Sequence, residues 1–217
     1  MSVLLLIRHG HTDSAGKRLT SWMPGVHLSE RGREEAERLA RRLDGIPVAA
    51  VYSSPLERCR ETAAPLADAR GLPVESREDL GEVRFGAWTD RTLAQLRHTR
   101  LWTAAQHSPS TVRFPEGESY LEVQDRALAE VERLVAAHPK QAIAVVSHGD
   151  VIRLLLAHFA GIHLDLFQRL AVDPASVSVI AAGEGPRIVC KMNDTGDLSV
   201  LERPSGGRRG SRQKVRG

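Results

Sequence analysis

Short apolar runs alternate with amphipathic helical patterns along most of this chain. The segments "SVLLLI" (2–7), "VAAVYSS" (48–54) and "QAIAVVSHG" (141–149) each have the length of a buried strand. A helical pattern separates each of these runs from the next. Parallel strands need helical crossovers and are buried on both faces. The alternation therefore predicts an α/β fold, a three-layer sandwich in which helices flank a mainly parallel central sheet.

Local signals place the ends of the first helices. Ser29 can cap a helix over 28–45, and Gly45 stands where that helix should stop. Pro55 suits the first turn of a second helix over 55–71. We expect further strands at 72–77, 175–183 and 186–194, and further helices at 92–106, 119–138 and 150–161.

Length and charge together indicate one domain with a basic tail. The chain has 217 residues, which suits a single domain, and we place it at 1–202 with a cap insertion at about 89–119. The net charge of +3 comes from 203–217, which holds six Lys and Arg and no acids, so the rest has 24 bases against 27 acids. We expect a disordered, solvated tail and no nucleic-acid partner, although the tail leaves a weak nucleic-acid contact open.

The sequence predicts a protein of the cytoplasm. No basic segment and cleavage site open the chain, and no apolar run is long enough to span a membrane. Cys59 and Cys190 alone cannot make a disulfide framework or a metal knuckle. The sequence leaves the oligomeric state open, with a homodimer as one expectation.

Polar residues follow three of the predicted strands. The first strand ends in Arg8-His9, Arg58 lies just after the second, and a later strand ends in Ser147-His148-Gly149. Ligands of open α/β sheets bind beyond the carboxyl ends of the strands. Arginine forks and helix N-termini both favour anions, so we expect a phosphate or carboxylate pocket there.

The His-x-His pair formed by His9 and His11 raises the alternative of a metal site. Arginines so close to the pair would repel a divalent cation, whereas an imidazole nitrogen can attack phosphorus with cations nearby. A departing alkoxide then needs a proton, which Glu82 in "LGEVRFGAW" can supply. Glu118 is a candidate carboxylate on the substrate side.

Four motifs in this order resemble the histidine phosphatase superfamily, also called the phosphoglycerate mutase-like family. They are "RHG", "SSPLERCRETA", "EVRFGAW" and "VVSHGDVIR", and the similarity runs over roughly 3–195. The resemblance implies the phosphoglycerate mutase-like fold, a phosphohistidine on His9 and no metal or organic cofactor. It further implies Glu82 as proton donor and a phosphoryl group bound by Arg8, Arg58 and His148.

Some positions depart from the family pattern. The phosphate-contacting loop often reads "SGW" or "TGW", but here it reads "TSW" over 20–22. His11 stands where many members have Glu, and Ala15 where many have Asn. The longer basic insertion of true mutases is not matched. We assign four residues to substrate binding: Thr12, Thr20, Ser21 and Gly149.

We therefore expect a cofactor-independent phosphatase that hydrolyses small-molecule phosphomonoesters. A cofactor-dependent phosphoglycerate mutase is one alternative. A phospholigand- or nucleic-acid-binding module without catalysis is another, and a metal hydrolase that uses the His-x-His pair is the last. One sequence does not specify the phosphorylated substrate.

Overall fold

The computed structural model of the chain describes residues 1–196. The expected basic tail at 203–217 lies outside the described residues. The strands are β1 (Ser2–Arg8), β2 (Val48–Ser53), β3 (Val74–Ser76), β4 (Ala142–Ser147), β5 (Val177–Ala182) and β6 (Ile188–Asp194). The α-helices are α1 (Glu30–Arg42), α2 (Glu57–Asp68), α3 (Leu93–Leu96), α4 (Arg100–His107), α5 (Tyr120–Ala137) and α6 (Gly149–Phe159).

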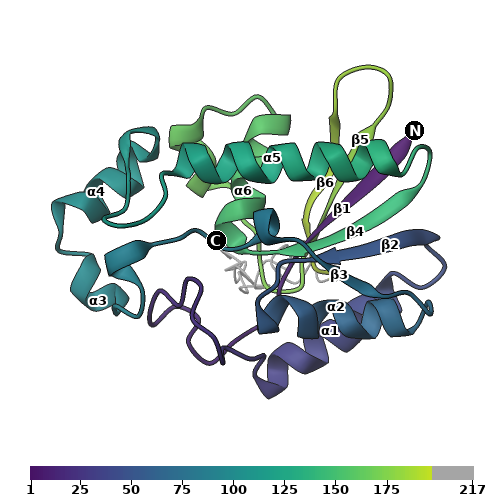
Figure 1. Cartoon of the computed structure of the whole chain (residues 1–217), viewed down its shortest axis with the longest axis horizontal. Coiled ribbons are helices and arrows are strands. Elements are labelled where there is room, and N and C mark those ends of the chain that lie inside the picture. Colours follow the sequence, from purple (N-terminus) through teal and green to yellow (C-terminus); the bar gives the residue numbers. More distant parts are fainter. Residues whose placement is uncertain (197–217) are drawn as a thin grey trace, which may run out of the picture.

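One six-stranded sheet runs through the molecule in the order β3-β2-β4-β1-β5-β6 (Figure 1). β1 pairs in parallel with β4, β4 with β2, and β2 with β3. β5 pairs antiparallel with β1, and β6 antiparallel with β5. The predicted α/β fold with a mainly parallel sheet is confirmed, with two antiparallel strands at one side.

Side-chain alternation along β1 separates two cores, one on each face of the sheet. Leu4 and Leu6 belong to the core that α5 and α6 cover. Leu5 and Ile7 belong to the core on the opposite face, beneath α1 and α2. These opposed faces, both covered by helices, make the three layers of the predicted sandwich (Figure 1).

The predicted helix starts are confirmed in part. The Ser29 side chain accepts a hydrogen bond from the N–H of Gly32 and caps α1, as expected. Pro55 is not in the first turn of α2, because Leu56 is still extended and the helix begins at Glu57. Arg58 is nevertheless in that first turn, where the sequence placed it.

The single helix predicted over 92–106 is wrong. Thr99 adopts an extended conformation, and its hydroxyl accepts from the N–H of Trp102 to cap α4. The same hydroxyl donates to the carbonyl of Leu96, at the end of α3. A local hydrogen-bonding threonine therefore divides this stretch into two short helices.

The insertion at 89–119 packs into the core rather than lying loosely on the surface. Leu96, Ala105 and Phe114 are buried in the same core as α5 and α6. Its first residues pair with the chain just after the first strand, through an antiparallel bridge between Arg18 and Thr92. This pairing fixes one end of the insertion beside the loop that follows β1.

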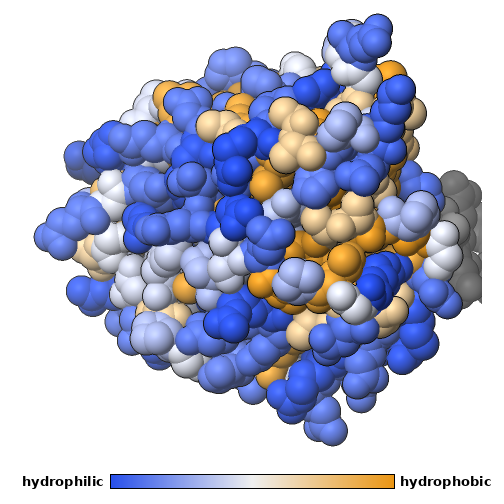
Figure 2. All heavy atoms as spheres, turned by 45° about the vertical axis from the view of Figure 1, so that its right-hand side comes forward, coloured by the Kyte–Doolittle hydropathy of each residue, from blue (hydrophilic) through white to orange (hydrophobic). Residues whose placement is uncertain are grey.

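Apolar side chains also gather on one face of the surface (Figure 2). The most exposed large apolar residues in the described part of the chain include Met1, Ile188 and Met192.

No helix within residues 1–196 is both long enough and apolar enough to cross a membrane. The expectation of a homodimer stays a prediction.

Two glycines let α1 approach the loop after β1. A Cβ on Gly10 would lie 2.6 Å from the carbonyl oxygen of Gly32, and a Cβ on Gly32 would lie 2.1 Å from that of His11. Both contacts are to backbone atoms, which cannot swing away as a flexible side chain would. The loop and the first turn of α1 are therefore packed backbone to backbone.

We predict that Gly32→Ala lowers the free energy of unfolding by about 1–3 kcal/mol, because the new methyl group overpacks the loop. Helix propensity alone predicts the opposite, a gain of up to about 1 kcal/mol for alanine in a helix. Urea unfolding measures the sign of this change in the free energy of unfolding. Gly185→Ala is the control, since nothing lies near a Cβ at that position. A stabilised Gly32→Ala variant would contradict the packing argument.

Candidate active site

The parallel register brings the ends of three strands to one edge of the sheet. Arg8 is paired with Ser147, and the N–H of His9 donates to the Ser147 carbonyl at 3.0 Å. The N–H of Ser54 donates to the carbonyl of Val146, so β2 ends at the same edge. As predicted, two histidines from distant segments meet: the rings of His9 and His148 have centroids 5.2 Å apart.

His9 is buried and held in one orientation. Its Nδ1 lies 2.8 Å from the carbonyl oxygen of Gly10, which can only accept, so Nδ1 carries the hydrogen. Burial lowers the pKa of His9 well below its usual value, and the charges of Arg58 and Arg8 lower it further. The imidazole is therefore neutral, with the Nε2 lone pair free to act as a nucleophile.

Arg58 supplies a buried cation beside the histidines. Only 1% of the residue is exposed, and Nη2 donates to the carbonyl of Ser21 at 2.9 Å. The same nitrogen lies 3.3 Å from Nδ1 of His148. Nη1 is buried and has no hydrogen-bond partner among the described residues. An unpaired buried donor of this kind fits an anionic ligand.

Arg8 completes the cationic part of the site. Nη1 donates to the carbonyl of Val172 at 2.6 Å, which fixes the side chain against the loop before β5. Nε is buried and unpaired among the described residues, like Nη1 of Arg58. Burial lowers the pKa of Arg8, and the nearby charge of Arg153 adds to this effect. The two arginines present unused donors from the end of β1 and from the first turn of α2.

His148 is fully buried, and its pKa is also lowered well below the usual value, first by burial and then by Arg58. Nε2 lies 2.8 Å from the hydroxyl of Ser54. Because Nδ1 faces the donor Nη2 of Arg58, Nδ1 must accept and the proton belongs on Nε2. His148 is therefore a second neutral imidazole.

Two helix N-termini also lie at this edge. Neither α2 nor α6 has a side chain that caps its first N–H groups. Gly149 opens α6, and a Cβ there would lie only 3.3 Å from Nε of Arg8. Uncapped N–H groups and the helix dipole favour a negative charge, so both helices add to the anion site.

Glu82 is the carboxyl group of the site. Oε1 accepts from the N–H of Val83 at 2.9 Å, and Oε2 lies 3.6 Å from Nδ1 of His148. Burial raises the pKa of Glu82 to about 7, and the charge of Asp150 raises it as well. Near neutral pH this carboxyl group can therefore both give and take a proton.

Ser21 supports the loop that carries Glu82, a role that the sequence did not suggest. Its hydroxyl donates to the carbonyl of Val83 at 2.8 Å and accepts from the N–H of Phe85 at 3.2 Å. The backbone of Ser21 is left-handed, with φ 45°, a conformation that favours glycine. The hydroxyl of Ser21 therefore holds the loop that carries Glu82, and substrate binding by Ser21 stays a prediction.

The other two predicted substrate contacts lie in the loop after β1. Thr12 is buried, with its hydroxyl 3.2 Å from that of Ser14. Thr20 is half-buried next to Ser21, whose carbonyl accepts from Arg58. Substrate binding by Thr12, Thr20 and Gly149 stays a prediction.

Glu118 does not offer its carboxylate to a substrate. Both oxygens accept hydrogen bonds from Arg126, and Oε2 also accepts from the N–H of Arg84. Sequence reasoning did not assign a function to Arg126, Ser54 or Asp150. Ser54 and Asp150 lie within the motifs "SSPLERCRETA" and "VVSHGDVIR", but the motifs alone gave these two residues no role. The backbone carbonyls that Arg126 contacts, at 79–82, are far away in the chain, so no local pattern marked this arginine.

His11 has hydrogen-bond partners of its own. Nδ1 lies 2.9 Å from the hydroxyl of Ser29, and the N–H donates to Glu35 at 2.8 Å. The two histidines of the His-x-His pair therefore have different hydrogen-bond partners. Within residues 1–196, no three His, Cys, Asp or Glu side chains are grouped so that they could hold a metal ion.

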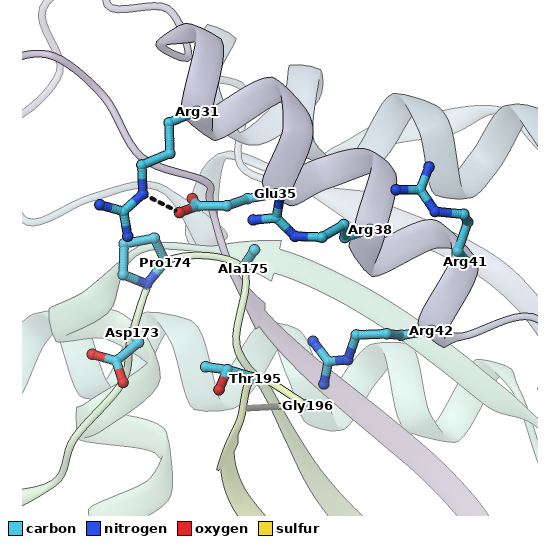
Figure 3. A pocket seen from close by; sticks show the side chains of 10 residues that line it. All are labelled: Arg31, Glu35, Arg38, Arg41, Arg42, Asp173, Pro174, Ala175, Thr195 and Gly196. Atoms are coloured by element: carbon cyan, nitrogen blue, oxygen red, sulfur yellow. Dashed lines mark hydrogen bonds and ion pairs between the residues drawn. The ribbon is translucent and has the colours of Figure 1, made fainter. Parts of the chain in front are cut away.

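A separate groove of about 910 Å³ lies between α1 and the loop at 173–175 (Figure 3). Several arginines line it, but Arg31 pairs with Glu35 at 2.8 Å, and Arg42 pairs with Asp194 at 2.6 Å. None of the proposed catalytic side chains lines the groove. It is an ion-paired surface feature and differs from the candidate active site.

Known proteins share this fold and these motifs. The model of the histidine phosphatase superfamily (branch 1) matches residues 4–195. Phosphoserine phosphatase 1 of Hydrogenobacter thermophilus is 30% identical, over 90% of this chain and 93% of its own length. The adenosylcobalamin/alpha-ribazole phosphatase of Escherichia coli K12 is 32% identical, over 82% of this chain and 88% of its own. Mycobacterial glucosyl-3-phosphoglycerate phosphatase, solved with VO3, has a TM-score of 0.80 at 28% identity and covers 88% of this chain and 98% of that chain.

The names of these three relatives describe phosphatases, each for a different phosphorylated compound. The family match spans nearly all of the described residues. Three of the four motifs include the ends of β1, β2 and β4, and the one that contains Glu82 follows β3. The chain belongs to branch 1 of the histidine phosphatase superfamily and is a phosphomonoesterase.

Proposed function

We propose that the enzyme hydrolyses small-molecule phosphomonoesters through a phosphohistidine on His9. The observation that carries this proposal is the state of the His9 ring. Nδ1–H is held by the carbonyl of Gly10, burial keeps the ring neutral, and Nε2 is free beside Arg8 and Arg58. A neutral imidazole next to two unpaired guanidinium donors is suited to attack a phosphate group.

In the first step, the Nε2 lone pair of His9 forms a bond to phosphorus as the ester P–O bond breaks. Arg8, Arg58 and the N–H groups that open α6 stabilise the charge on the phosphoryl oxygens. The protonated Glu82 transfers its proton to the departing alkoxide, which leaves as an alcohol. The ring is then phosphorylated at Nε2, and Glu82 is a carboxylate.

In the second step, a water molecule attacks the phosphohistidine. The Glu82 carboxylate accepts a proton from this water, the P–N bond breaks, and its electron pair returns to Nε2 of His9. Inorganic phosphate leaves, and both side chains are back in their starting states. A carboxyl group with a pKa of about 7 suits this double use, because it exchanges protons readily near neutral pH.

The proposed substrates are small phosphorylated metabolites with an alcohol as leaving group. The names of the relatives cover phosphoserine, a ribazole and a glucosyl-phosphoglycerate, which have the phosphate ester in common. The phosphate-binding side chains lie at the end of β1 and at the starts of helices, while the insertion at 89–119 packs beside the loop that follows β1. We propose that this insertion selects the organic part of the substrate.

Mixing the enzyme with p-nitrophenyl phosphate should leave a phosphoryl group on the peptide that contains His9. The N–P bond is acid-labile, so the adduct is read by mass spectrometry after quenching in base. Glu82→Gln should accumulate more of it, because the second step then has no base. His9→Ala should carry no adduct and lose activity, whereas His158→Ala, at the far end of α6, should behave as the wild type. Full activity in folded His9→Ala would exclude the mechanism.

The raised pKa of Glu82 also predicts a cost in stability. A folded carboxyl group with a pKa of about 7, against 4.5 as the ordinary value, binds more protons than the unfolded chain between these pH values. Stability is therefore lost as the pH rises through this window, by up to about 3 kcal/mol. Glu82→Gln should remove this loss, so its advantage in urea unfolding should grow from about pH 5 to about pH 8. An advantage that is independent of pH would mean that the carboxyl group is not perturbed by folding.

A further inference from the structure

Arg126, on α5, uses its whole guanidinium group to hold the segment that carries the catalytic carboxyl group. The side chain is only 16% exposed, and Nε and Nη2 donate to the two carboxylate oxygens of Glu118. Its remaining bonds go to backbone carbonyls around Glu82. Nη1 donates to Asp79 at 2.7 Å and Gly81 at 2.9 Å, and Nη2 donates to Glu82 at 3.0 Å.

The carbonyl of Glu82 receives a second donor, the indole Nε1 of Trp22 at 2.6 Å. Trp22 also packs against Gly81, where a Cβ would lie 2.0 Å from the indole ring. Two hydrogen bonds therefore hold the backbone carbonyl of Glu82, one from Arg126 on α5 and one from Trp22 in the loop after β1. Because Oε1 is engaged by the N–H of Val83, the carboxyl group has one oxygen left for proton transfer, Oε2.

Glu118 makes hydrogen bonds to the backbone of Arg84, two residues after Glu82. Its Oε2 accepts from the N–H of Arg84 at 2.9 Å, and its own N–H donates to the Arg84 carbonyl at 2.9 Å. The Arg126–Glu118 pair therefore touches the chain on both sides of the catalytic carboxyl group. All nitrogens of Arg126 are engaged in these contacts, so this arginine is not a phosphate ligand like Arg58.

We propose that Arg126, oriented by Glu118, is a positioning residue that holds Oε2 of Glu82 where it can protonate the leaving oxygen. The inference rests on the proposed role of Glu82 as the acid. A carboxyl group that is displaced by about 1 Å loses much of its efficiency, because proton transfer depends on short hydrogen-bond geometry. The phosphate contacts of Arg8 and Arg58 do not depend on Arg126 in this way.

The dependence of the hydrolysis rate on the leaving group tests this role. p-Nitrophenolate departs without a proton, whereas the alkoxide of benzyl phosphate needs one. Loss of the positioning residue should therefore slow benzyl phosphate far more than p-nitrophenyl phosphate. The ratio of the two kcat/KM values does not depend on the fraction of folded enzyme, so a partly unfolded variant is still informative.

In Arg126→Met we expect the ratio of kcat/KM, benzyl over p-nitrophenyl phosphate, to fall at least about tenfold, with the loss in kcat rather than KM. The ratio should fall less in Arg126→Lys, because a single ammonium group can still reach one carbonyl. Arg133→Met is the matched control, since Arg133 lies on the same helix and pairs with Glu130 away from the site. Its ratio should be that of the wild type.

Equal losses on both substrates, or no loss at all, would overturn the proposal and leave Arg126 a purely structural residue. In a Glu82→Gln background, adding Arg126→Met should leave the ratio unchanged, because the acid it positions is already absent. The single variant Glu82→Gln separates two failures. If it leaves the ratio unchanged, the proposed role of Glu82 is wrong and this inference falls with it. If Glu82→Gln lowers the ratio but Arg126→Met does not, only the inference about Arg126 fails.

Discussion

The parallel pairing of β1 with β4, and of β4 with β2, is the constraint on which the site depends. Parallel strands end at the same edge, so His9 and His148 meet although most of the chain separates them. The same pairing places the N-termini of α2 and α6 beside them, with Arg58 and Gly149 in the first turns. The strand order therefore brings the histidines and arginines of the site together, whereas Glu82 lies on a loop whose backbone is held by Arg126 and Trp22.

Burial gives the gathered groups their reactivity. Two buried guanidinium groups favour an anion, and burial together with their charges keeps the neighbouring imidazoles neutral. The carboxyl group responds in the opposite direction, because burial and Asp150 raise the pKa of Glu82. The same environment therefore keeps both histidines neutral, so that His9 can act as a nucleophile. It also gives an acid, Glu82, that can still carry its proton near neutral pH. The arginine donors that have no described partner match the oxygens of a phosphate group.

Sequence reasoning predicted what rests on local pattern or ordered motifs. Strand periodicity, the cap at Ser29 and the histidines at the strand ends are of this kind. The break at Thr99 was missed, because a residue that caps a helix also fits within one. The hydrogen bonds by which Ser21 and Arg126 hold the loop around Glu82 were missed, because their partners are distant in sequence. Such contacts are set by how the loops pack on the sheet, and neither composition nor spacing encodes them visibly.

The central claim concerns the state of one imidazole ring. Nitrogen-15 NMR of the histidine side chains, with His9 assigned through His9→Ala, reads its protonation and tautomer directly. We predict a neutral ring at about pH 6, protonated at Nδ1 and bare at Nε2, because burial and Arg58 lower the pKa of His9. An imidazolium at that pH, or a ring protonated at Nε2, would contradict the account, since His9 would then have no free electron pair at Nε2 to attack phosphorus.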